Sequence, residues 1–175
     1  MPIKALRSWL RLDGADQAEP APLRDLLDAL DRLEAGRARY LARFAYLLGR
    51  VAHADRHVSA EETRAMENIL MKEGHLSPEQ AMLVVGLART SNLLFGGTAD
   101  YLIAQEFAHN STYEEKLGLV GCLFAVSATD QAITMAEETE IHRIANQLRL
   151  NPSDLTALRL AHRKHLPGLA AGSDD

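Results

Sequence analysis

Residues 54–62 read Ala-Asp-Arg-His-Val-Ser-Ala-Glu-Glu, and residues 129–137 read Thr-Asp-Gln-Ala-Ile-Thr-Met-Ala-Glu. In both stretches an Asp is followed by a β-branched apolar residue at +3, a hydroxyl residue at +4 and a Glu at +7. The two Asp residues, Asp55 and Asp130, stand 75 positions apart. We refer to Asp55 with Glu62 as the first acidic corner and to Asp130 with Glu137 as the second. A motif that recurs in this way indicates an internal repeat.

The similarity between the two stretches extends to both sides of the motif. At the same offset the matching pairs are Leu48 with Leu123, Met66 with Ile141, and Ile69 with Ile144. When one residue of the first copy is left out of the alignment, Leu76-Ser77-Pro78 also aligns with Leu150-Asn151-Pro152. We therefore predict a duplicated helix–turn–helix–turn–helix unit whose copies pack about a pseudo-twofold axis.

The composition favours one helical domain. The chain has 175 residues, of which 47% are hydrophobic and 5% aromatic, and Ala and Leu, both strong helix formers, dominate. No strand pattern is present, so the predicted fold is all-α, a single compact domain of about seven to nine helices built from two quasi-repeats. The expected boundaries are an N-terminal amphipathic segment and linker over 1–21, the helical domain over 22–165 and a flexible tail over 166–175.

Charge and apolar patterning exclude several classes of protein. A formal net charge of −5 argues against a nucleic-acid binder, because phosphate contacts need a basic surface. No apolar run reaches the roughly 18 residues that a membrane span needs, and no signal peptide is recognisable. Residues 3–12 form a short basic amphipathic segment, for which weak contact with a membrane surface and docking on the domain both stay open. The single Cys122 favours a reducing, cytoplasmic location.

Helix ends are indicated by capping pairs, in which a hydroxyl residue is followed three positions later by Glu or Gln. The pairs are Ser59 with Glu62, Ser77 with Gln80, Ser111 with Glu114, and Thr134 with Glu137. We also expect a helix from Pro22 to about Glu34, a break at Gly36, helices over 37–54, 78–90, 112–129 and 135–148, and a helix end at Gly74. The last helix is expected to run from Asn151-Pro152 to about Lys164. Helical spacing predicts that Met66, Met71, Met82 and Met135 belong to the core.

The acidic corners allow two interpretations. Capping alone accounts for Glu62 and Glu137. Asp55 and Asp130 fall where long helices end, and the helix dipole disfavours an anion there, so each either accepts N–H groups of the next helix or ligates a cation. Oxygen ligands suit Ca²⁺ or Mg²⁺ better than Zn²⁺. The spacing is not that of an EF-hand, since the twelfth position is Met66 in one copy and Ile141 in the other.

The segments 51–62 and 126–137, each with an apolar helix before and an amphipathic helix after it, resemble the TerB-like family of tellurite-resistance proteins. Related domains occur at the N-termini of some DnaJ-type co-chaperones. The resemblance covers roughly residues 37–164. It implies a compact helical domain with a metal or ion site at Asp55, Glu62, Asp130 and Glu137, and a role in stress resistance or protein assembly. Family members usually have Gly after the Asp, where this chain has Arg56 and Gln131, and Arg56 can neutralise an acid that a metal would need.

The other groups of residues give weaker indications of a functional site. His53 and His57 flank Asp55 and form at most a partial Zn²⁺ or Ni²⁺ site. Cys122 lies in an apolar helical run and is expected to be an inert thiol rather than a nucleophile. No phosphate loop, His-Glu-x-x-His motif or nucleophile elbow is present, so we expect no enzyme. A small metallohydrolase would need His53, Asp55 and an acid of the other copy at one point.

Two functions therefore follow from the sequence. The first is a non-enzymatic adaptor linked to stress or tellurite resistance, with a divalent cation held by the two acidic corners and a protein partner of unknown identity. The alternative is a metal-free protein-interaction or co-chaperone-like module, in which the corner residues only connect helices. The alternative predicts an exposed apolar groove for a partner helix.

Overall fold

A computed structural model describes residues 21–52, 59–91, 100–130 and 132–166 of the chain. Within these ranges the structure contains eight α-helices, two short 3₁₀ helices and no strand, which confirms the all-α prediction. None of the helices in these ranges is long and apolar enough to cross a membrane. The N-terminal segment 3–12 and the end of the tail lie outside the described residues.

The helices follow one another with short connections. Their bounds are α2 Ala21–Asp31, α3 Ala35–Val51, α4 Ala60–Lys72, α5 Pro78–Ser91, α6 Asp100–Asn110, α7 Tyr113–Ser127, η1 Ala128–Asp130, α8 Met135–Gln147, α9 Pro152–Ala161 and η2 Arg163–His165. The expected helices over 37–54 and 112–129 thus end a few residues early, at Val51 and Ser127, and the last helix gives way to a 3₁₀ turn before Lys164.

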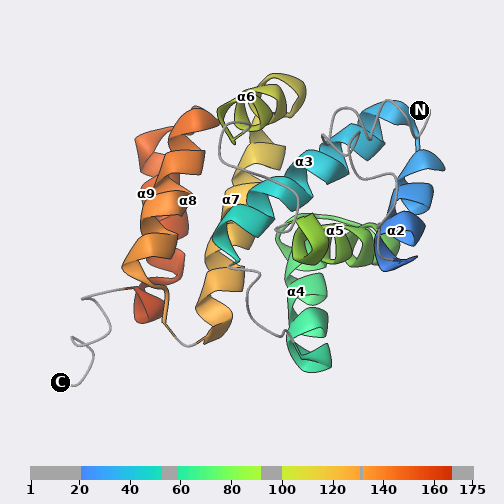
Figure 1. The fold of residues 1–175 in the computed structure, drawn as a ribbon. Coiled ribbons are helices and arrows are strands. Elements are labelled where there is room, and N and C mark those ends of the chain that lie inside the picture. Colours follow the sequence, from blue (N-terminus) through green and yellow to red (C-terminus); the bar gives the residue numbers. More distant parts are fainter. Residues whose placement is uncertain (1–20, 53–58, 92–99, 131, 167–175) are drawn as a thin grey trace.

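Helix α3 is the centre of the molecule. It contacts α2, α5, α6, α7 and α8, and most of its residues from Ala38 onward are buried. Figure 1 shows α2, α4 and α5 on one side of α3, and α7, α8 and α9 on the other. A helix that is covered on all sides needs apolar residues around its whole circumference, and α3 has them.

The core joins α3 to α6 and α7. Tyr40 stacks on Phe107 with ring centroids 5.4 Å apart, and Phe44 meets Phe107 edge to face at 6.4 Å. Phe44, Phe107 and Phe124 are among the largest fully buried side chains. The ring contacts attach the last turn of α6 to the first half of α3.

Capping chemistry sets most helix starts as predicted, with one correction. Ser59 with Glu62 and Thr134 with Glu137 form reciprocal capping boxes, and Ser77 with Gln80 makes the same pair of bonds. The prediction for Ser111 with Glu114 was wrong, because the box is formed one residue later by Thr112 with Glu115. Helix α6 continues to Asn110, so Ser111 is the single residue between it and the cap.

The break near the start of the domain is also displaced from the prediction. Helix α2 ends at Asp31 rather than Glu34, and Gly36 lies inside the first turn of α3. Glu34 is the N-cap of α3, and its two carboxylate oxygens accept the N–H groups of Gly36 and Arg37 at 2.9 and 3.0 Å. A carboxylate cap satisfies two orphan N–H groups and suits the helix dipole.

The end of α4 shows why Gly74 is needed there. Gly74 does not adopt a positive φ; the two described non-glycine residues that do are His75 (φ 54°) and Arg149 (φ 60°). A Cβ on Gly74 would lie 2.7 Å from the Leu70 carbonyl oxygen and 3.2 Å from Cys122 Sγ. Gly74 therefore permits close packing of α4 on α7, while the left-handed turn falls on the next residue.

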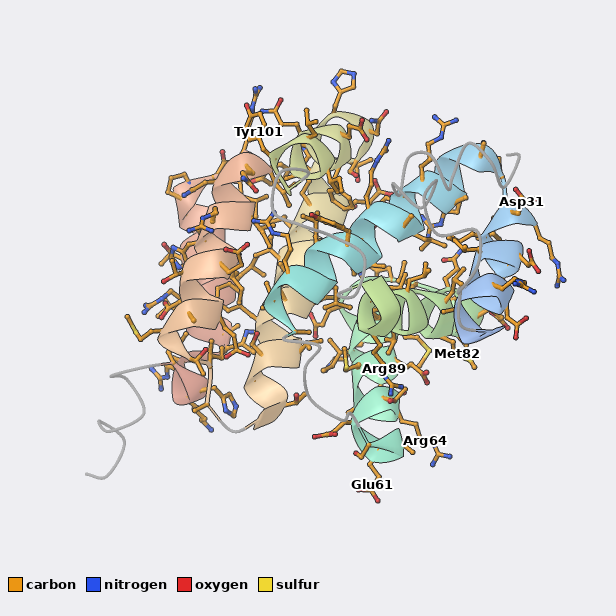
Figure 2. The ribbon with its side chains drawn as sticks, in the orientation of Figure 1. Asp31, Glu61, Arg64, Met82, Arg89 and Tyr101 are labelled. Atoms are coloured by element: carbon orange, nitrogen blue, oxygen red, sulfur yellow. The ribbon has the colours of Figure 1, made fainter. Side chains whose placement is uncertain are left out.

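Two methionines predicted to be buried are exposed. Met66 is in the core and Met71 packs against it. Met82 and Met135, however, are 59% and 66% exposed, and Figure 2 shows Met82 on the outside of α5. Met82 lies in a helix whose other faces are already covered, and Met135 is the first residue of α8, so neither has a neighbouring helix to cover it.

Candidate functional site

The acidic corners lie where two long helices end and two shorter ones begin. The first corner lies between Val51, the end of α3, and Ala60, the start of α4. The second lies between Ser127, the end of α7, and Met135, the start of α8, with the 3₁₀ helix η1 between them. Asp55, His53 and His57 lie outside the described residues, and so does the side chain of Asp130. The structure therefore describes the Glu of each corner.

Glu137 is buried at the start of α8. Its Oε2 accepts from the Thr134 N–H at 2.7 Å and from the Thr134 hydroxyl at 2.8 Å. The Thr134 Oγ1 in turn accepts the N–H of Glu137 at 3.2 Å. The residue is only 8% exposed, and its Oε1 forms no hydrogen bond or ion pair with the residues that the structure describes. Because Oε1 is not among the buried side-chain atoms that lack a partner, it reaches the surface and is open to a ligand there.

Glu62 occupies the same position at the start of α4 but is exposed. Its Oε2 accepts the Ser59 N–H at 2.6 Å, and the Ser59 Oγ accepts the Glu62 N–H at 3.1 Å. The two corners share their backbone chemistry and differ in burial.

The chain after α9 lies beside the second corner. The N–H of Ile133 donates to the carbonyl of His165 at 2.6 Å, and Leu166 is 1% exposed. His162 stacks on Phe124 of α7, with ring centroids 5.9 Å apart. These contacts fasten the end of the described chain against the turn that leads into α8.

A buried ion pair joins the region of the first corner to that of the second. Arg50, in the last turn of α3, donates from Nε to Glu140 Oε1 at 2.8 Å and from Nη1 to Gln147 at 3.2 Å. Its side chain is 8% exposed, and that of Glu140 19%. Arg50 stands five residues before Asp55, and Glu140 stands three residues after Glu137. The end of α3 therefore lies against the first half of α8.

The sequence reasoning did not identify Arg50 as part of this region. The signal that could have found it is its spacing from Arg43, because residues seven apart lie on one helix face. Both arginines stand in a run that is otherwise apolar. Arg43 is also buried and pairs with Glu106 of α6 at 3.1 Å.

The described residues offer neither a metal-binding cluster nor a reactive thiol. The described residues contain no group of three or more His, Cys, Asp or Glu side chains placed to hold a metal ion, and the side chains of Asp55 and Asp130 are not among them. Cys122 is fully buried, and burial raises the pKa of its thiol to about 12. A thiol that stays protonated at neutral pH is not a nucleophile, as the sequence predicted.

Comparison with protein families gave one match. The family model described as "Tellurite resistance protein TerB" matches residues 41–160, from the first half of α3 to the end of α9 and across both acidic corners. No curated protein and no solved structure matches the chain.

Proposed function

The chain belongs to the TerB family of tellurite resistance proteins, and on this premise we propose that it is a non-catalytic adaptor whose two acidic corners bind a divalent cation. Asp55, Glu62, Asp130 and Glu137 are the proposed ligands. The proposed biological role is the one that the family name suggests, resistance to tellurite or a related stress, with a protein partner.

The buried carboxylate of Glu137 is the observation that carries this proposal. A buried charge is usually paired with an opposite charge or coordinates a metal, because leaving it uncompensated is costly. Capping by Thr134 satisfies one oxygen, and no cationic side chain of the described residues pairs with the other. The start of α8 compensates part of the charge, and the uncapped oxygen, which reaches the surface, is the one that a cation would bind.

The packing of the helices supports the proposal that the two acidic corners lie close to each other. Helix α3 contacts α8, and α4 contacts α7, which is the reciprocal pairing that two copies related by a pseudo-twofold axis would produce. The positive-φ residues His75 and Arg149 both precede the Leu-Ser-Pro or Leu-Asn-Pro segment that matched in the sequence. We infer that the duplication extends to the backbone.

The chemistry of the donor set favours hard cations. Four carboxylates supply only oxygen ligands, which Ca²⁺ and Mg²⁺ prefer, and Ca²⁺ accepts the more irregular arrangements. Zn²⁺ binds more tightly where His or Cys contributes. We therefore rank Ca²⁺ and Mg²⁺ above Zn²⁺. Arg56, where the family usually has Gly, would weaken the site by neutralising one of the acids.

Thermal unfolding with and without Ca²⁺, Mg²⁺ and Zn²⁺ tests the proposal. A cation that binds only the folded chain at about 100 times its dissociation constant adds about 2.7 kcal/mol, so the midpoint should rise. Glu137→Gln should abolish this rise while leaving the metal-free midpoint nearly unchanged, because Gln also serves in a capping box. Asp55→Asn combined with Asp130→Asn should abolish it too.

Glu115→Gln is the matched control. Glu115 caps α7 through the same bonds with a Thr, but the residue seven positions before it is Ala108 rather than Asp. This variant should keep the full response to the cation. A midpoint indifferent to all three cations at millimolar concentration would exclude the cation site.

The second candidate function, a metal-free interaction module, is favoured by exposed apolar side chains on α6. Tyr101 and Leu102 are adjacent and are 56% and 58% exposed, and Figure 2 shows Tyr101 at the edge of the molecule. Indifference to cations, together with loss of partner binding in Leu102→Ser but not in Met82→Ser, would support this function. Met82 is equally exposed and lies on α5.

A further inference from the structure

A second polar site lies at the opposite end of α3 from the first acidic corner. A cavity of about 310 Å³ is lined by Glu34, Gly36, Arg37, Arg39, Tyr40, Arg43, Asn110 and Glu115. It is formed by the first half of α3, the end of α6 and the start of α7. Its volume is at the lower end of the range for small-molecule sites. Because α3 has 17 residues, the cavity and the end of the helix are roughly 20 Å apart.

The cavity is less negative than the chain as a whole. Three arginines and two glutamates line it, and one of the arginines, Arg43, is paired with Glu106, whereas the chain has a formal net charge of −5. The helices α3 and α7 both begin at its rim, and helix N-termini favour anions. A small anion would therefore meet less repulsion in the cavity than the net charge of the chain suggests.

Several of the charged groups around the cavity already have hydrogen-bond partners within the protein. Both oxygens of Glu34 cap α3, and these bonds lower the pKa of Glu34. Glu115 caps α7 through Thr112 at 2.8 Å. Arg37 donates to Gln80 at 2.7 Å and lies over the Tyr40 ring. The acids are thus directed into helix ends rather than toward a ligand.

Two donors remain available. Arg39 is exposed and forms no hydrogen bond or ion pair with the residues that the structure describes. Tyr40 is 9% exposed and lines the cavity, and its hydroxyl bonds no residue that the structure describes. This hydroxyl is not among the buried polar atoms that lack a partner, so it reaches the surface at the cavity. Because the ring is fixed by contacts with Arg37 and Phe107, the hydroxyl is a preorganised donor that is open to a ligand.

We propose that this cavity binds a small organic anion bearing a carboxylate or phosphate group, held by the guanidinium of Arg39 and the hydroxyl of Tyr40. The guanidinium presents two parallel N–H donors to such a group. The Tyr40 O–H adds a third donor, since Tyr40 also lines the cavity. The site is independent of the acidic corners and of any cation bound there.

Titration of the full chain in two-dimensional NMR tests the proposal, with succinate as the carboxylate probe and inorganic phosphate as the phosphate probe. At least one probe should cause saturable shifts in the amide signals of residues 34–43. Arg39→Gln should raise the dissociation constant at least about tenfold, as expected for the loss of a charge-assisted bond. Tyr40→Phe, which keeps the ring, should raise it about fivefold.

Arg64→Gln is the control for net charge. Arg64 is an exposed arginine on α4, a helix that contributes no residue to the cavity. This variant should bind as the wild type does. The proposal is overturned if neither probe produces saturable shifts, or if Arg39→Gln and Arg64→Gln have equal dissociation constants. Because Arg39 is exposed, its variant should retain the wild-type unfolding midpoint, which separates loss of binding from loss of fold.

Discussion

At the scale of single residues, burial determines the chemistry of the side chains. The Cys122 thiol and the Glu137 carboxylate are both buried, but the thiol has an apolar environment and the carboxylate has a capping partner. The consequence is a protonated, inert thiol in one case and a carboxylate that caps a helix in the other.

The Cys122 thiol should make stability depend on pH in the alkaline range. Its pKa is about 12 in the fold against 9.0 for a free thiol, so the unfolded chain loses the proton first as pH rises. The stability contributed by the protonated thiol is fully present below pH 9 and is lost progressively toward pH 12. Urea unfolding of the wild type and of Cys122→Ala should show this difference in pH dependence. Equal slopes for the two proteins between pH 8 and about pH 10 would contradict it.

At the scale of helices and turns, local chemistry decides where a helix begins, and packing decides how it ends. Four hydroxyl–carboxylate or hydroxyl–amide pairs start α4, α5, α7 and α8. The ends are less regular. In the first copy Gly74 is the extra residue that the repeat alignment removes, and it sits in a space with no room for a Cβ.

Introducing a glycine at position 75 and replacing the glycine at position 74 should therefore have opposite effects on the stability of the fold. His75→Gly and Arg149→Gly should each stabilise the fold by roughly 1 kcal/mol, because left-handed backbone is strained for residues with a Cβ. Gly74→Ala should destabilise it by about 1–3 kcal/mol through overpacking against Leu70 and Cys122. Chemical denaturation of the three variants measures these changes. A stabilised Gly74→Ala protein would disprove this account of the α4 end.

At the scale of the whole molecule, α3 joins the two segments that the sequence predicts to be copies, since it contacts α7 and α8. The Arg50–Glu140 pair joins α3 to α8, whereas the positions related to these residues by the repeat offset are Ala125 and Ala65. One of the two reciprocal interfaces thus has a buried ion pair where the other has two small residues.

Breaking this ion pair should be costly. Glu140→Gln removes the carboxylate that accepts from Arg50 in the α3–α8 interface and should destabilise the fold by about 2–3 kcal/mol, somewhat less than for a fully buried pair because Glu140 keeps some exposure. Arg143→Ala removes the other arginine that contacts Glu140, but its side chain is 61% exposed and the loss should stay below about 0.5 kcal/mol. Urea unfolding distinguishes the two, and equal losses would show that burial of Arg50 is not what matters.

Much of the fold could be predicted from the sequence because helix signals are local. Apolar spacing, capping pairs and Pro positions indicated the all-α class and most helix starts, and the TerB resemblance is confirmed by the family match. The misplaced box at Ser111 shows the limit of such signals. Two adjacent hydroxyl residues precede two adjacent glutamates there, so the local pattern has two equivalent registers.

The sequence by itself determined the helical class and the capping role of Glu62 and Glu137, because each depends on residues within one or two turns of chain. Only the tertiary structure decided that Glu137 is buried and Glu62 exposed, that Arg50 pairs with Glu140, and that Met82 and Met135 face solvent. These properties depend on which distant segment covers a surface. A periodic pattern identifies the apolar face of a helix, but it does not contain the position of the neighbour that buries it.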